Sequence, residues 1–269
     1  MDPKTYSFPL VGPISLSARV GHGSLTVAAR DGLAEATVTI AARDRDLLDK
    51  TTVEMRGSTL TVHAPRQGGL ADLIGGWRKG DRLDVTIEVP TGTAAKLMTA
   101  TAPIVVTGSI GPSDVATGNA NVDLAAVTGD LRLRYGNGES RVGSVTGSVQ
   151  LKAGRCDARF GDVAGSLSSG LGSGSLNAAT VRGDLHSRTG SGSTSVEAVY
   201  GNVDLATGSG TLTVGVPDGV SVRLDITTGS GSLHSDLPVE QGPRKGARAV
   251  TLRARTGSGD VRLVRAPAA

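Results

Sequence analysis

Apolar and polar residues alternate along most of the chain, which predicts short β-strands joined by tight turns. In residues 14–20 every second position is apolar, and the turn Gly21-His22-Gly23 follows. Because successive side chains of a strand point to opposite faces, this alternation is typical of strands with one buried face. The alternation resumes and predicts further strands over residues 25–27, 36–40, 53–55, 60–62 and 83–89.

Two short segments of the first hundred residues have a distinct pattern. Residues 53–62 predict a hairpin about Gly57, and Pro90 ends the strand over 83–89 because proline removes a ladder donor. Residues 41–50 are either a single helical turn or a charged loop.

From residue 100 onward the chain repeats itself every 18 residues. One glycine leads each repeat, a second follows seven positions later, and a small residue stands two positions after that. The leading glycines are Gly111, Gly129, Gly147, Gly165, Gly183, Gly201 and Gly219. A fixed period near 20 residues is typical of a solenoid, in which each repeat is one turn of a coil.

Five positions of the repeat are mainly apolar, namely the second, fourth, eleventh, thirteenth and sixteenth after the leading glycine. Ser169 and Ser187 interrupt the fourth position. We expect two strands per coil, with these side chains inward and stacked about 4.8 Å apart from coil to coil. The glycines are expected at the corners. Since Ala120 and Cys156 share the second corner with glycines, we expect that corner to be tight rather than left-handed.

The pattern predicts an all-β fold: a parallel β-helix-like solenoid forming a single domain over 1–269. Its parts are irregular N-terminal β coils or a cap (1–96), regular 18-residue repeats (97–219) and C-terminal coils or a cap (220–269). After Gly219 the period stretches, a loop rich in Pro, Gly and charge occupies 235–248, and a last strand pair follows.

Composition agrees with a thin core. The chain has 39 glycines but only one Trp, two Phe and three Tyr, and aromatic residues supply much of the area in wide cores. The net charge of +3 comes without a dense Lys/Arg run or an aromatic stacking set, which argues against nucleic acid. The lone Cys156 excludes an intramolecular disulfide. We expect a cytoplasmic protein, since no signal peptide or membrane span is seen.

The motif set resembles a known family. A strand ending in Val89-Pro90-Thr91-Gly92 is followed by repeated Thr-Gly-Ser-Gly turns, as at 189–192, 207–210, 228–231 and 256–259. These motifs are similar to those of a large bacterial β-strand-repeat family of unknown function, often labelled "putative adhesin". The segments 12–16 and 255–260 look like those of actinobacterial members without signal peptides. The resemblance covers nearly the whole chain and implies the fold, with no active-site residues.

Catalytic and metal chemistry find little support in the repeat. Phosphate loops need a helix after their glycines, and here strands follow. The aspartates fall in several different positions of the repeat, so no calcium ladder forms. Hexapeptide acyltransferases need an aliphatic residue every six positions, and glycosidases need paired carboxylates. We expect no catalytic residue, metal or cofactor, and no small-molecule substrate. The isolated histidines His22, His63, His186 and His234 are expected to be exposed or locally bonded.

Two groups of residues are candidates for partner binding. Residues 66–81 carry a compact apolar cluster, either folded back over the first coils or exposed as a docking tip: Leu70, Leu73, Ile74 and Trp77. Six basic residues fall on two adjacent repeats, as a solvated face or a patch for an acidic partner: Arg132, Arg134, Arg141, Lys152, Arg155 and Arg159. Arg132, Arg134 and Lys152 are the ones we select for testing.

The sequence therefore predicts a non-catalytic scaffold that presents rigid sheet faces and loops to a protein partner or to itself. Self-association is expected through exposed strand edges. The alternative is an adhesin-like module that binds carbohydrate or the cell envelope.

Overall fold

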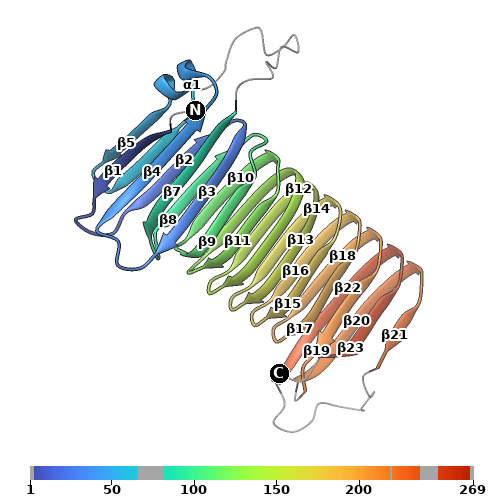
Figure 1. The fold of residues 1–269 in the computed structure, drawn as a ribbon. Helices are drawn as coiled ribbons and strands as arrows, with labels where there is room; N and C mark the ends of the chain where they lie inside the picture. The colour runs from blue at the N-terminus through green and yellow to red at the C-terminus, as the bar shows by residue number, and fades with distance from the viewer. Residues whose placement is uncertain (1–2, 66–81, 219, 237–247, 267–269) are drawn as a thin grey trace, which may run out of the picture. The chain divides into compact units, whose positions relative to one another are not determined.

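The computed structural model describes residues 3–65, 82–218, 220–236 and 248–266 (Figure 1). The chain divides into two compact units, Met1–Thr128 and Gly129–Ala269. Each unit is a stack of β coils, which confirms the predicted β-solenoid. The prediction of a single domain over 1–269 stays a prediction.

Unit 2 contains the most regular coils. Two strands of 15 residues pass round a corner, and the following coils each have two shorter strands. The strands are β12 (Leu131–Val145), β13 (Val149–Val163), β14 (Leu167–Ser173), β15 (Leu176–Val181), β16 (Leu185–Ser191), β17 (Thr194–Val199), β18 (Val203–Ser209) and β19 (Leu212–Val216). They pair in parallel with residues 18 apart opposite one another, as Leu131 with Val149. The predicted period is therefore the register of the sheet.

The five predicted inward positions are buried in unit 2. Leu167, Leu176 and Val181 are all 0% exposed. Ser169 and Ser187, which interrupt the apolar pattern, are buried too, and the Ser169 hydroxyl donates to the Ser187 hydroxyl at 2.7 Å. Stacking identical positions thus gives buried hydroxyls partners on the next coil, which offsets the cost of removing them from water.

A sixth inward position was not predicted. It lies six residues after the leading glycine and is buried at four coils of unit 2: Tyr135, Leu171, Thr189 and Thr207. Alternation continues along the strand to this point, so its side chain shares the face of positions two and four. Threonine hid the position from a reading based on apolar residues.

Glycines occupy the corners for two physical reasons. At the leading corner, a Cβ on Gly165 would lie 2.5 Å from the Gly147 carbonyl oxygen, so coils approach too closely for a side chain. At the second corner Gly138, Gly174, Gly192 and Gly210 have φ between 110 and 153°. The expectation that this corner is not left-handed was wrong for these coils, because glycine alone adopts such φ values without strain.

Unit 1 has strands of both orientations and one helix. Its elements are β1 (Lys4–Pro9), β2 (Ser15–Val20), β3 (Gly23–Arg30), β4 (Glu35–Ala42), α1 (Arg45–Lys50), β5 (Thr52–Arg56), β6 (Thr59–His63), β7 (Leu83–Pro90), β8 (Ala94–Thr99), β9 (Ile104–Ile110), β10 (Ser113–Asn119) and β11 (Val122–Val127). The segment 41–50 contains the helix of its two readings, with the Asp44 side chain capping it. The predicted hairpin about Gly57 is confirmed by antiparallel pairing of β5 with β6.

The coils of unit 1 do not stack in sequence order. The β2–β3 coil lies between the β6–β7 coil and the β8–β9 coil, because β2 pairs with both β6 and β8, and β3 with both β7 and β9. Antiparallel strands then cover the outer coil: β5 pairs with β6, β4 with β7, and β1 with β4. Helix α1 packs against β4 and buries Leu47 and Leu48.

The C-terminal coils of unit 2 are also out of sequence order. Their strands are β20 (Val220–Ser230), β21 (Leu233–Ser235), β22 (Arg248–Ser258) and β23 (Val261–Arg265). The β22–β23 coil pairs with β18 and β19 on one side and with β20 and β21 on the other. The last strands of the chain therefore lie one coil inward, and the earlier β20–β21 pair, here called the terminal coil, lies outside them (Figure 1).

Candidate functional site

The predicted apolar cluster of Leu70, Leu73, Ile74 and Trp77 lies in 66–81, outside the described residues. Both readings of that segment, folded back or exposed, stay predictions.

The structure brings together the three basic residues selected from the sequence. Arg134 lies directly opposite Lys152 on the parallel strands β12 and β13, and Arg132 lies opposite Gln150. All three basic side chains point to the exposed face, since they alternate with buried neighbours along each strand. The spacing of adjacent parallel strands, about 4.8 Å, places the two facing positive charges on one short patch.

The other basic residues of the predicted patch do not all join this face. Arg141 lies opposite Arg159, and both follow the corner that Gly138 makes in β12. Arg155 lies opposite Asn137, at the corner itself. The six predicted residues are therefore divided between two faces of the coil and the corner between them.

The position that holds Arg134 and Lys152 continues through all the later coils of unit 2. In register it holds Arg134, Lys152, Gly170, Arg188, Ala206, Arg255 and Thr227. We call its four basic members, Arg134, Lys152, Arg188 and Arg255, the cationic column. Sequence reasoning missed Arg188 and Arg255. The period alone indicates Arg188, three repeats after Arg134, whereas Arg255 joins the column only because its coil is inserted out of order.

A shallow groove runs beside the cationic column. It has a volume of about 730 Å³ and crosses β14, β16, β18, β22 and β20, which Figure 1 shows side by side. Its floor is the glycine position two residues further on: Gly172, Gly190, Gly208 and Gly257. A Cβ on Gly190 would lie 2.7 Å from the Gly172 carbonyl oxygen, so the floor is bare backbone. Arg188 and Arg255 line one side of it.

A row of serines follows the glycine floor on its other side. One residue after each glycine, the paired strands align a serine of every coil: Ser173, Ser191, Ser209, Ser258 and Ser230. The groove is thus bounded by guanidinium groups on one side and hydroxyl groups on the other, with no side chain between them.

The positive charge of the column is not neutralised by nearby acids. Asp204 lies 3.4 Å from the imidazole of His186, and Asp225 accepts from Arg253 at 2.9 Å, so these two carboxylates have their own partners. In the described ranges, Lys152, Arg188 and Arg255 form no ion pair. An anion reaching the groove would therefore meet uncompensated guanidinium and ammonium groups.

The acidic residues of the corners have a structural role. A side-chain oxygen of one coil accepts the backbone N–H of the next at the leading corner: Ser148 donates to Asp130, Ser166 to Ser148, Asp184 to Ser166, Asn202 to Asp184 and Thr251 to Asn202. The distances are 2.8–3.2 Å. These groups hold successive coils in register, and their electron pairs are directed at the backbone.

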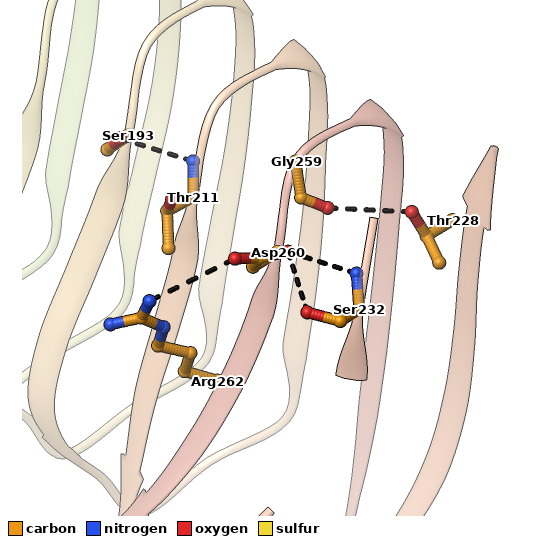
Figure 2. Close-up of polar contacts among 7 residues, drawn as sticks. All are labelled: Ser193, Thr211, Thr228, Ser232, Gly259, Asp260 and Arg262. Atoms are coloured by element: carbon orange, nitrogen blue, oxygen red, sulfur yellow. Dashed lines mark hydrogen bonds and ion pairs between the residues drawn. The ribbon is translucent and has the colours of Figure 1, made fainter. Parts of the chain in front are cut away.

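The second corner repeats this arrangement. Figure 2 shows Asp260 accepting from both the N–H and the hydroxyl of Ser232, at 3.0 and 2.8 Å, with Arg262 also near it. These hydrogen bonds favour the ionised form and lower the pKa of Asp260. Thr211 likewise donates its N–H to the Ser193 hydroxyl (Figure 2).

Groups able to act as nucleophiles or metal ligands are not assembled in the part of the chain that the structure describes. Burial raises the pKa of the Cys156 thiol to about 11, so it is protonated at neutral pH. Burial also raises the pKa of Tyr135. Among the described residues no three His, Cys, Asp or Glu side chains come close enough to hold a metal ion. The helix in the described ranges is too short to cross a membrane.

The Thr-Gly-Ser-Gly repeats, the stacked parallel coils and the glycine corners are the features of one family, and a family model for Toastrack DUF4097 matches residues 20–266. The chain belongs to the Toastrack DUF4097 family. No curated protein matches it in sequence.

Several solved structures resemble this Toastrack protein. A "putative adhesin" from Parabacteroides distasonis is 14% identical over 98% of this chain and 97% of its own, with a TM-score of 0.46. A "putative lipid binding protein" from the same organism is 11% identical over 98% and 97%, with a TM-score of 0.49. A "putative adhesin" from Parabacteroides merdae is 11% identical over 98% and 96%, with a TM-score of 0.40.

Proposed function

We propose that this Toastrack protein is a non-catalytic interaction scaffold, and that the cationic column of unit 2 binds an extended acidic segment of a protein partner. The observation that carries the proposal is the register that aligns Arg134, Lys152, Arg188 and Arg255 beside a groove without side chains. Rigid strands hold these charges at fixed intervals, so the surface is organised before a partner arrives.

The spacing of the charges favours a peptide. Lys152, Arg188 and Arg255 are each two coils apart, since Gly170 and Ala206 stand between them. Two coils correspond to about 9.6 Å. Three residues of an extended peptide span about 10 Å. An acidic side chain at every third position would therefore meet each basic group in turn, while the peptide backbone lies over the glycine floor.

The scaffold reading also rests on how the acids are used. The described corner carboxylates accept backbone N–H groups of neighbouring coils, and the Cys156 thiol is buried. The cytoplasmic location expected from the sequence stays a prediction.

Binding can be tested with a fluorescein-labelled peptide that has glutamate at every third position and glycine or serine between. We expect fluorescence anisotropy to show binding that weakens as salt is raised, because the charges are exposed and a Debye length is about 10 Å at 0.1 M salt. Reversing Arg188→Glu and Arg255→Glu together should weaken binding by about tenfold or more. The matched control, Arg141→Glu with Arg159→Glu, changes the same charge beyond the corner and should retain most of the affinity.

Two further probes decide between explanations. A peptide of the same composition with its glutamates clustered at one end should bind more weakly if spacing matters. Equal loss of binding in the test and control variants would reduce the effect to net charge and overturn the proposed site. Binding of an acidic polysaccharide such as polygalacturonate, with no binding of the peptide, would instead favour the adhesin-like carbohydrate module.

A further inference from the structure

The terminal coil leaves one side of its main strand without a partner among the described residues. β20 pairs with β22 and β21 pairs with β23, and no other described strand pairs with either of them. Half of the backbone N–H and C=O groups of an edge strand point away from the sheet and are available to another strand.

The inward side chains of this coil are exposed, in contrast to their equivalents elsewhere. Leu224 is in register with Leu252 and Val203, yet it is 42% exposed where they are 1% and 3%. Leu233 is 48% exposed although its partner Val261 is fully buried. These leucines occupy core positions that lack the next coil, so a further strand placed against β20 would bury apolar surface as well as pair backbone groups.

The sequence of β20 is complementary to itself when two copies run antiparallel. Arg223 and Asp225 flank Leu224, and Val222 and Ile226 flank them in turn. If Leu224 faces Leu224 of a second copy, then Arg223 faces the second copy's Asp225, and Val222 faces its Ile226. Opposite residues of an antiparallel pair share a face, so apolar side chains meet apolar ones and opposite charges meet.

We propose that β20 pairs with β20 of a second copy of this chain in that antiparallel register, forming a twofold dimer centred on Leu224. Asp225 already accepts from Arg253 on β22 at 2.9 Å. In the dimer it lies between that guanidinium group and Arg223 of the second copy. Parallel pairing in the same register places Arg223 against Arg223 and is disfavoured, because like charges directly opposite are destabilising.

A contact of this kind closes on itself. The same patch is used by both copies, so pairing ends at two chains and leaves no further β20 edge available. The other described edge, β1 in unit 1, carries Lys4 and Pro9, which are residues that discourage edge-to-edge pairing. The structure therefore points to a dimer rather than a fibre.

Charge reversal gives a specific test on the full chain. In analytical ultracentrifugation the unmodified protein should form dimers as concentration rises. Arg223→Asp should weaken dimerisation by about tenfold or more, because both symmetric charge pairs become Asp against Asp. Asp225→Arg should do the same with Arg against Arg. An equimolar mixture of the two variants restores both opposite-charge pairs and should form heterodimers.

The control is Asp123→Arg, the same charge change at an exposed site of unit 1, which should dimerise like the unmodified protein. Thermal unfolding of each variant shows whether it is folded, and recovery in the mixture cannot come from misfolded chains. A strictly monomeric protein at the highest attainable concentration, or a dimer insensitive to both reversals, would overturn the proposal.

Cross-linking reports the register independently. In a Cys156→Ser background, Leu224→Cys should give a disulfide-linked dimer on mild oxidation, since directly opposite residues are close enough for a disulfide. Asp123→Cys is the matched control and should remain monomeric. Equal cross-linking of both variants would show random collision and contradict the twofold register.

Discussion

The outer coils of the two units have similar inward positions and opposite surroundings. In unit 1 the β6–β7 coil is covered by β5, β4 and β1, and its Leu60, Val62 and Ile87 are 0% exposed. In unit 2 no described strand covers the terminal coil, and Leu224 and Leu233 remain about half exposed. Burial at an inward position is thus decided by whether another layer follows it.

This difference explains why unit 1 has antiparallel strands and a helix. A parallel coil ends in a row of unpaired backbone groups and a cross-section of its apolar core. In unit 1 the chain turns back to satisfy both, with hairpin β5–β6 and strands β4 and β1. The corresponding need at the terminal coil is what the proposed β20 pairing would meet.

The largest effect is expected when equivalent leucines of the two outer coils are truncated. Leu60→Ala should lower the free energy of unfolding by about 2–5 kcal/mol, because it leaves a cavity in a closed core. Leu224→Ala should cost about 1 kcal/mol, since nearly half of its side chain is already in water. Urea unfolding of both variants, at protein concentrations below any dimerisation, measures the two values. Similar values for the two would contradict the difference in covering.

A second contrast concerns the glycines of the two units. A Cβ at Gly192 would lie 1.7 Å from the Gly174 carbonyl oxygen, and its φ is 150°. Gly192→Ala should therefore cost about 1–3 kcal/mol from backbone strain, with more if the coils separate. Gly57 in the unit 1 hairpin has φ 57° and open space around it, so Gly57→Ala should cost about 1 kcal/mol. Thermal unfolding of the pair checks the order, and a costlier Gly57 variant would refute it.

The threonines of the sixth inward position sharpen the comparison further. In unit 1 the Thr99 hydroxyl donates to that of Thr117 at 3.0 Å, whereas in unit 2 the buried hydroxyls of Thr189 and Thr256 have no partner. Thr99→Val should lower stability by about 1 kcal/mol by removing a buried hydrogen bond. Thr189→Val should be neutral or stabilising by a similar amount. Chemical denaturation distinguishes the two, and equal losses would show that the Thr189 hydroxyl does have a partner.

The smallest expected effect is on the acid side of the stability profile. Donation from the Ser175 hydroxyl, at 2.6 Å, and from its N–H lowers the pKa of Asp157 in the folded protein. Its contribution to stability is therefore complete above the unfolded-state pKa and is lost as pH falls through the folded-state pKa. Ser175→Ala should raise the Asp157 pKa toward its ordinary range, as followed by NMR titration. Ser193→Ala, which removes a corner hydroxyl bonded to a backbone N–H, should leave that pKa unchanged.

Much of the candidate site followed from the repeat. Arg134 and Lys152 were predicted to lie together because they are 18 residues apart, and the structure places them opposite each other. Arg188 obeys the same arithmetic but was missed, since Gly170 interrupts the run of charge. The expected patch with Arg141 and Arg159 was too wide, because the corner at Gly138 turns those residues to another face.

The sequence alone determined the register, the glycine corners and five of the six inward positions, because a solenoid places residues one period apart in contact. Only the tertiary structure decided the order of the coils at the ends. Thr228-Gly229-Ser230-Gly231 and Thr256-Gly257-Ser258-Gly259 are the same motif, so either strand fits beside β18 equally well by pattern. Contact with β18 goes to β22, and this single choice places Arg255 in the groove and leaves β20 at the edge.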